Sequence, residues 1–271
     1  MSARALPVLM YHHVTPNPGL VTVSPSTFRA QMAWLAGHGY RGIGARELED
    51  FLAGRPLPDK SVLISFDDGY LDNYVYAHPA LREFGLKGLI FLITGWLGDG
   101  PARRHAGEAG ELPACPNHRE ATALVQAGQA DQAMLRWSEV EAMAAAGSFE
   151  FHSHTHSHSR WDKTVAEPQA RREALAADLA DSRAALAART GSSAHLCWPQ
   201  GYYDDDYRQV AREAGFRYFY TVEKRINTPA TPAENIGRMV VKDRTGGWFA
   251  SRLFLYRQPI LGSLYLRLRG D

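Results

Sequence analysis

The sequence predicts an α/β protein, either a (β/α) barrel or an open parallel sheet covered by helices. Two observations indicate this class. Short apolar runs alternate with longer helical patterns along the 271 residues. Most of these runs are near-continuous rather than alternating, which is typical of parallel strands buried on both faces. The length suits one domain of barrel size, and we expect residues 1–271 to form a single domain.

About eight candidate strands follow one another along the chain. They are Leu6–Tyr11, Tyr40–Ile43, Ser61–Phe66, Leu89–Thr94, Phe149–Phe151, His195–Trp198, Tyr218–Val222 and Ile236–Val241. Between them, apolar residues recur at helical spacing, as at Phe28, Met32 and Leu35. In a barrel, the carboxyl ends of such strands meet at one face, where the catalytic groups of barrel enzymes collect.

Two segments depart from the strand–helix alternation. Residues 98–136 are rich in Gly, Ala, Pro and charged residues, and they predict an insertion with a weak helix from about residue 119 to 135. This insertion could form a lid, although a surface loop without function is about as good an interpretation. Residues 248–271 mix apolar side chains with arginines, which is compatible with a docked C-terminal helix or with a peripheral contact to anionic lipid.

The composition argues against several classes of function. The formal net charge is +1, from 30 basic and 29 acidic residues, and no basic stripe interleaves with aromatics, so we expect no nucleic-acid partner. Two cysteines, Cys115 and Cys197, are too few for a disulfide framework. No run approaches the ~20 apolar residues of a membrane span, and no signal peptide is visible. A cytoplasmic protein is the expectation.

Residues 65–69, Ser-Phe-Asp-Asp-Gly, place two adjacent carboxylates at the end of an apolar strand. Neighbouring side chains at a strand end point in different directions. One of Asp67 and Asp68 can therefore bind a metal while the other faces a substrate water. A surface turn is the simpler interpretation of Asp-Asp-Gly alone. The apolar neighbours favour a functional role, because an unpaired charge among them would be costly.

Four histidines fall within residues 152–158, directly after a short strand. If the turn there is helical, His154 and His158 lie on one face at i, i+4 and can bind one ion. His152 and His156 would then point elsewhere. One carboxylate plus two histidines is the ligand set of a catalytic Zn²⁺ that keeps a position open for water. The two motifs predict a metal-dependent hydrolase, with an adventitious metal-binding loop as the alternative.

Two further strand ends carry candidate groups. Residues 11–13, Tyr-His-His, end the first strand, where a histidine is either a core residue or a candidate general acid beside a metal. Residues 198–203, Trp-Pro-Gln-Gly-Tyr-Tyr, form a turn that exposes backbone N–H groups. Such groups can stabilise an oxyanion, although an ordinary loop turn fits the segment equally well.

Taken in this order, the motifs resemble those of the polysaccharide deacetylases of carbohydrate esterase family 4, the NodB-homology family. The resemblance runs from about Pro7 to Asp243 and implies a distorted (β/α) barrel of about seven strands. Residues 65–69 match [T/S]-F-D-D-G, which implies that Asp67 is the catalytic base and Asp68 a metal ligand. Residues 154–158 match H-[S/T]-x-x-H, which implies that both terminal histidines, His154 and His158, are metal ligands.

Residues 8–14, Val-Leu-Met-Tyr-His-His-Val, resemble the poly-N-acetylglucosamine deacetylases, a branch whose barrel is circularly permuted. That resemblance implies that His12 is the catalytic acid. Residues 198–201 resemble the third family motif, and Gln200 stands where the family has Tyr or Phe, so its N–H is implied for the oxyanion. The family arginine beside the motif's proline is absent, and Arg238 is interpreted as orienting Asp67 instead. The expected substrate or supporting contacts are Trp198, Pro199, Tyr202 and Arg238.

These inferences predict a metal-dependent hydrolase that removes N-acetyl groups from an amino sugar in a glycan or glycan precursor. The expected cofactor is one divalent metal, Zn²⁺ first, with Co²⁺, Ni²⁺ or Fe²⁺ also suited to the ligands. O-deacetylation is the nearest chemical alternative. A non-catalytic metal- or glycan-binding module is the alternative of another class. A metal-dependent phosphoesterase would need cationic phosphate clamps, and none is visible near the motifs.

Overall fold

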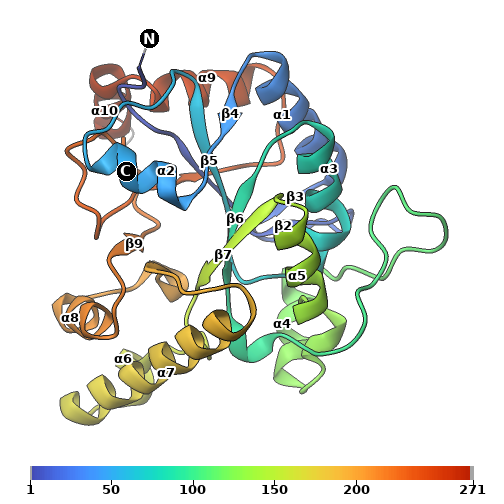
Figure 1. Ribbon diagram of the computed structural model, residues 1–271, viewed down its shortest axis with the longest axis vertical. Helices are drawn as coiled ribbons and strands as arrows, with labels where there is room; N and C mark the ends of the chain where they lie inside the picture. The colour runs from blue at the N-terminus through green and yellow to red at the C-terminus, as the bar shows by residue number, and fades with distance from the viewer. Residues whose placement is uncertain (1, 269–271) are drawn as a thin grey trace.

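The computed structural model describes residues 2–268 and has the α/β architecture that the sequence predicts. Its main sheet has the strand order β10-β1-β5-β6-β7-β8-β9, with β4 paired to β5 beside this path. Every one of these strand pairs is parallel. Figure 1 shows the sheet curling through the middle of the molecule with helices on its outside. The prediction of a distorted barrel of parallel strands is confirmed as a curled sheet, whereas the circular permutation stays a prediction.

The eight predicted strands all have counterparts, and most are shorter than expected. They are β1 (Val8–Tyr11), β4 (Arg41–Gly42), β5 (Ser61–Phe66), β6 (Gly88–Leu92), β7 (Phe149–Ser153), β8 (His195–Cys197), β9 (Tyr218–Tyr220) and β10 (Met239–Val240). Every residue of β5 and β6 is buried, as expected for strands covered on both faces. A separate parallel pair, β2 (His13–Val14) and β3 (Thr22–Val23), was not predicted.

The segment that leads into β10 brings the two edges of the curled sheet together. Ile236 forms a parallel bridge to β9, and Met239 pairs with β1 three residues later. The Asn227 side chain ties the same region to the first strand by donating a hydrogen bond to the Leu6 carbonyl at 3.3 Å. In sequence, Arg238 lies between the bridging residues Ile236 and Met239, and its side chain is fully buried.

Helices connect the strands and cover the sheet. The α-helices are α1 (Pro25–Gly37), α2 (Ala45–Leu52), α3 (His78–Glu83), α4 (His118–Gln126), α5 (Trp137–Ala145), α6 (Trp161–Thr164), α7 (Pro168–Arg189), α8 (Asp205–Glu213), α9 (Gly247–Tyr256) and α10 (Pro259–Leu268). A π-helical turn (Asn73–Ala77) and 3₁₀ turns at Thr94–Trp96, Ala130–Gln132 and Pro199–Gly201 complete the elements. Long helices thus alternate with strands, as the sequence pattern indicates.

The segment 98–136 packs onto the barrel near the end of β5. Its helix α4 begins where the weak helix was predicted to begin, because Asn117 caps it and accepts a hydrogen bond from the Glu120 N–H at 3.1 Å. The helix ends at Gln126, earlier than predicted. Arg103 anchors the rest of the segment through an ion pair with the fully buried Glu139, 2.7 Å away. Ala121 of α4 packs in a buried cluster with Tyr70.

The described part of the tail contains α9, which begins at Gly247, and α10, and the two helices pack together. Phe249 and Leu253 of α9 belong to the main core, and Trp34 of α1 contacts the Phe249 ring edge-on at 5.7 Å. The last three residues of the tail, 269–271, lie outside the described residues. Among the described helices, none combines the length and the apolar character needed to span a bilayer.

Candidate active site

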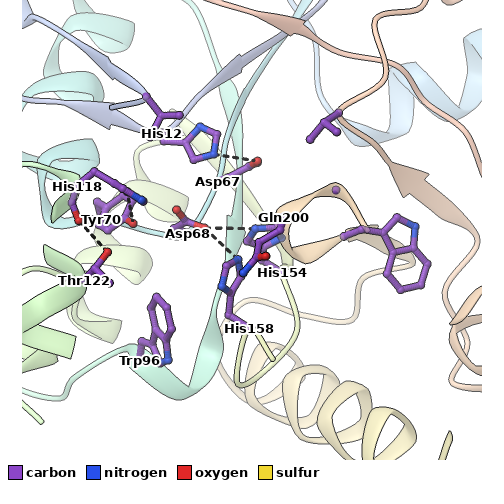
Figure 2. Close-up of a pocket in the computed structure, with 14 residues that line it drawn as sticks. His12, Asp67, Asp68, Tyr70, Trp96, His118, Thr122, His154, His158 and Gln200 are labelled. Atoms are coloured by element: carbon purple, nitrogen blue, oxygen red, sulfur yellow. Dashed lines mark hydrogen bonds and ion pairs between the residues drawn. The ribbon is translucent and has the colours of Figure 1, made fainter. Parts of the chain in front are cut away.

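The carboxyl ends of several strands surround a pocket of about 370 Å³ (Figure 2). Seven of the predicted site residues line it, namely His12, Asp67, Asp68, His154, His158, Trp198 and Gln200. The other three do not. Arg238 lies buried behind Asp67, Pro199 is buried in the adjoining turn, and Tyr202 packs under Arg160, whose guanidinium is 3.9 Å from the ring centroid.

Asp68, His154 and His158 point toward one another, as Figure 2 shows. Asp68 Oδ1 is 3.3 Å from His154 Nε2 and 3.8 Å from His158 Nε2, and the three donor atoms all lie within 4.8 Å of one another. Asp68 and Gly69 both have positive φ angles, of 73° and 82°, so the chain turns sharply as it leaves β5. Because of this turn, the Asp68 carboxylate faces the two histidines while the neighbouring Asp67 carboxylate contacts other residues.

The donor set fits a divalent metal ion. The ring of His154 is oriented by the Cys197 carbonyl, which lies 2.8 Å from Nδ1 and accepts its N–H, so Nε2 is the nitrogen turned toward Asp68. Burial lowers the pKa of His154, but Cys197 and Asp68 outweigh it and raise the pKa above its ordinary value, so Nε2 must give up its proton when a metal binds. Burial, followed by the neighbouring His154, lowers the pKa of His158 to about 4. Its imidazole is therefore neutral at physiological pH, as a metal ligand must be.

A second donor group does not suit a metal. Asp67, His154 and Cys197 also lie within 4.8 Å of one another. However, the Arg238 guanidinium contacts both Asp67, at 2.6 Å, and Cys197 Sγ, at 3.1 Å. A fixed positive charge already occupies this place, so a cation is disfavoured there.

The turn that joins His154 and His158 is not helical. The helical turn considered from their i, i+4 spacing is therefore wrong. Strand β7 continues through Ser153, so His152 is a buried strand residue whose Nδ1 lies 2.7 Å from Ser193 Oγ. Thr155 and His158 have φ angles of 66° and 58°. Two left-handed residues therefore fold the chain back, and the spacing alone did not distinguish this turn from a helix.

Asp178 of α7 holds this turn, and the sequence analysis missed it. Its Oδ1 accepts hydrogen bonds from the backbone N–H groups of His156, at 3.0 Å, and Ser157, at 2.7 Å. Its Oδ2 accepts from the Trp161 indole at 3.1 Å. A sequence signal existed: Asp178 lies three residues after Leu175, on the leucine-containing face of the helix that is buried. A buried acid on that face needs partners.

Asp67 is 2 % exposed, and its carboxylate is paired with a buried guanidinium. Arg238 donates to Oδ1 at 2.6 Å and to Oδ2 at 2.8 Å, and its Nε donates to the Thr221 carbonyl at 2.9 Å. Burial by itself would raise the pKa of Asp67, but Arg238 and then His12 outweigh it and hold the pKa below its ordinary value. The carboxylate is ionised and oriented, as a base must be.

His12, not its neighbour His13, faces the pocket. His12 Nε2 is 3.6 Å from Asp67 Oδ2, and burial is the main reason that the pKa of His12 is lowered. The His13 ring is buried, stacks on Tyr70 at 3.6 Å and lies 2.6 Å from Asp72 Oδ2 through Nδ1. His12 and His13 are neighbours in the extended chain that leads from β1 into β2, and alternation along it explains why the two rings point in opposite directions.

Other lining residues come from places that the motifs did not indicate. His118 and Thr122 belong to α4, so the insertion supplies one wall of the pocket. Tyr70 donates its hydroxyl proton to, or accepts one from, His118 Nδ1 at 3.2 Å, and burial together with the Asp68 carboxylate raises the pKa of Tyr70. Trp96 completes this side, with its ring centroid 5.5 Å from that of His158.

Comparison with known proteins agrees with this geometry. The family model described as polysaccharide deacetylase matches residues 54–219, more than half of the chain. The chain belongs to the polysaccharide deacetylase family. The matched range contains both the carboxylate motif and the histidine motif, so the family predicted from these residues is confirmed.

Curated relatives of this deacetylase-family chain match it over different lengths. YxkH of Bacillus subtilis (strain 168), whose name describes a polysaccharide deacetylase, is 43 % identical over 89 residues, which are 32 % of this chain and 32 % of the relative. Poly-beta-1,6-N-acetyl-D-glucosamine N-deacetylase of Escherichia coli (strain K12) is 33 % identical over 93 residues, 34 % of this chain and 14 % of the relative. The protein of that name from Staphylococcus aureus (strain MSSA476) is 26 % identical over 227 residues, 82 % and 68 % of the two chains. The matches thus span a third or less of the first two relatives.

Solved structures share the fold along nearly the whole chain. IcaB from Ammonifex degensii has a TM-score of 0.72 and 26 % identity, and the match covers 95 % of this chain and 99 % of IcaB. The Streptococcus pyogenes deacetylase PplD, solved in complex with acetate, also has a TM-score of 0.72, at 21 % identity, and the match covers 95 % and 100 % of the two chains. The predicted NodB-like fold is therefore confirmed.

Proposed function

We propose that this chain is a metal-dependent hydrolase that removes N-acetyl groups from an amino sugar of a glycan. One observation carries the proposal: the convergent Asp68, His154 and His158 donors lie in the same pocket as the buried, ionised Asp67. The names of the E. coli and S. aureus relatives support poly-N-acetylglucosamine as the substrate class.

Asp68, His154 and His158 would hold one divalent ion, and two nitrogens with one carboxylate suit Zn²⁺, Co²⁺, Ni²⁺ or Fe²⁺. We propose Zn²⁺, because this ligand set matches a catalytic zinc site that keeps a position open. When bound, such an ion supplies Lewis-acid polarisation of the amide carbonyl and makes water more acidic. The remaining chemistry belongs to the residues of the chain.

Asp67 would accept the proton of the attacking water, because Arg238 keeps its carboxylate ionised. His12 would deliver a proton to the leaving amine. Burial lowers the pKa of His12, so its imidazole is neutral at the start and must receive the proton that it delivers. Asp67 is 3.6 Å away and is the source that the geometry favours. The Gln200 backbone N–H, at the pocket wall, would stabilise the developing oxyanion.

The test is acetate release from N-acetylglucosamine oligomers, measured while metal is titrated into the chelated protein. Two neighbouring variants form a matched pair. Asp67→Asn should keep stoichiometric metal and lose turnover, whereas Asp68→Asn should lose or weaken metal binding. Acetate release by both variants at the parent rate would contradict the proposal. Stoichiometric metal without acetate release from N-acetyl or O-acetyl sugars would favour the non-catalytic binding module.

A further inference from the structure

We propose that α9 and α10 form a docking surface for an anionic membrane, separate from the active-site pocket. The proposal does not depend on the proposed function. It rests on the exposed apolar side chains of these helices, on the charges around them and on a cationic cleft beside them.

Large apolar side chains are exposed on these two helices more than elsewhere in the described part of the chain. Five of the nine exposed large apolar residues of residues 2–268 lie here: Phe254 (52 %), Ile260 (75 %), Leu261 (51 %), Leu264 (52 %) and Leu268 (78 %). An α-helix turns by about 100° per residue, so the four on α10 share one arc of about 100°. Gly262 and Leu266 lie on the opposite, buried side of the same helix.

Arginine dominates the charges of this segment, which Asp243 and Asp271 flank in the sequence. From Arg244 to Gly270 the sequence contains five arginines and no Asp or Glu. Arg257 is paired with Asp59, at 2.5 Å, and does not belong to the docking surface. At about 100° per residue, Arg267 lies just outside one edge of the apolar arc on α10, and Tyr265 lies just outside the other edge. The Arg252 guanidinium lies 5.0 Å from the Tyr265 ring centroid, so cations border both edges.

A small cleft of about 120 Å³ adjoins the Tyr265 edge of the apolar arc. Among residues 2–268 its lining includes three cations and three aromatic residues, and no acidic side chain: Lys224, Lys242, Arg252, Trp248, Tyr256 and Tyr265. Cations beside an apolar face attract the phosphates of anionic lipids, and aromatic rings with polar tips favour the membrane interface. The cationic cleft would contact the lipid headgroups, and the apolar arc would contact the acyl chains beside them.

A membrane fits this surface better than a second copy of the chain does. A twofold contact would bring the same arginine-bordered face against itself, and the like charges would repel. Docking to a membrane also leaves the pocket accessible. The cleft and the pocket share no lining residue, and Figure 1 places α9 and α10 near the N-terminus, at the other end of the molecule from α4, α6 and α7.

The experiment is co-sedimentation of the full chain with vesicles of phosphatidylcholine alone or of phosphatidylcholine mixed with phosphatidylglycerol. The chain should bind the anionic vesicles, and added salt should weaken binding. Leu261→Ser/Leu264→Ser should weaken it by about tenfold or more, because each leucine loses its apolar burial in the bilayer. Leu20→Ser, at an exposed leucine away from these helices, is the matched control and should bind as the parent does.

Three outcomes would overturn the proposal. The first is no binding to the anionic vesicles, or equal binding to both vesicle types. The second is a double variant that binds like the parent. The third is a dimer, seen by sedimentation velocity, that the double variant abolishes, because this would make a second copy the occupant. Thermal unfolding and acetate release should match the parent in both variants, which shows that the loss concerns the surface alone.

Discussion

Replacing Arg238 by Met should destabilise the fold far more than a surface substitution does. Arg238 is fully buried and makes two hydrogen bonds to Asp67, which is itself 2 % exposed. Met fills much of the volume but leaves a buried carboxylate without its countercharge. Breaking a buried ion pair from one side typically costs about 3–5 kcal/mol, most of it from the charge that remains.

A double variant separates this cause from lost packing. In Asp67→Asn/Arg238→Met no charge is stranded, so the double variant should be more stable than Arg238→Met alone. The measurement is urea unfolding of the metal-free chain in the presence of a chelator. With an m-value of about 2 kcal/mol/M, the single variant should shift the unfolding midpoint by about 2 M. A single variant within about 1 kcal/mol of the parent, or a double variant no more stable than the single, would refute the reasoning.

The same pair predicts a pH dependence. The pKa of Asp67 is held below its unfolded value of about 3.9, so ionised Asp67 contributes stability above that pH. This contribution is lost as the pH falls through the folded pKa. Without Arg238, burial is opposed only by weaker partners and the pKa of Asp67 rises. The acidic limb of the rate profile should therefore move to higher pH in Arg238→Met, and an unmoved limb would contradict the role of Arg238.

Three further outcomes follow from the site. His154→Ala should abolish stoichiometric metal and activity together, and full metal content in that variant would exclude this ligand set. His12→Ala should keep metal and lose about 10²–10⁴ in rate on an amide, but less on an activated ester, because the ester's leaving group needs no proton; an equal loss on both would indicate a structural role. Asp178→Ala should weaken metal affinity by about 10–100-fold, with recovery in Asp178→Asn, because the amide oxygen still accepts from the turn. Asp181→Ala, at an exposed acid of the same helix, is its control, and an equal effect there would contradict the role of Asp178.

Sequence patterns predicted well what a short stretch of chain determines. The continuous apolar run of β5 ends at Asp67, so the strand and the position of both carboxylates followed from local residues. The family resemblance predicted that His12 and His154 share one pocket, and parallel pairing brings the ends of their strands together despite the distance in sequence.

The parts that the sequence did not predict depend on long-range packing or on backbone turns. Asp178 holds the histidine turn from the middle of a charged helix, and His118 reaches the pocket from the insertion. Neither residue belongs to a motif, and only tertiary contacts place them. The spacing of His154 and His158 fits both a helix and the left-handed turn that the structure contains.

The position of Arg238 near the end of the chain has a consequence for biosynthesis. A ribosome releases residues 61–68, with the proposed base and one proposed metal donor, long before it releases the segment that joins the two edges of the sheet. Domains complete their packing only when the contributing segments are available. Asp67 therefore acquires its countercharge in the same step in which Ile236 and Met239 bridge β9 and β1. A nascent chain that stops short of residue 238 has both carboxylates but not the ion pair that orients Asp67. If Asp67 is the base, as proposed, the chain can become active only when the barrel is complete.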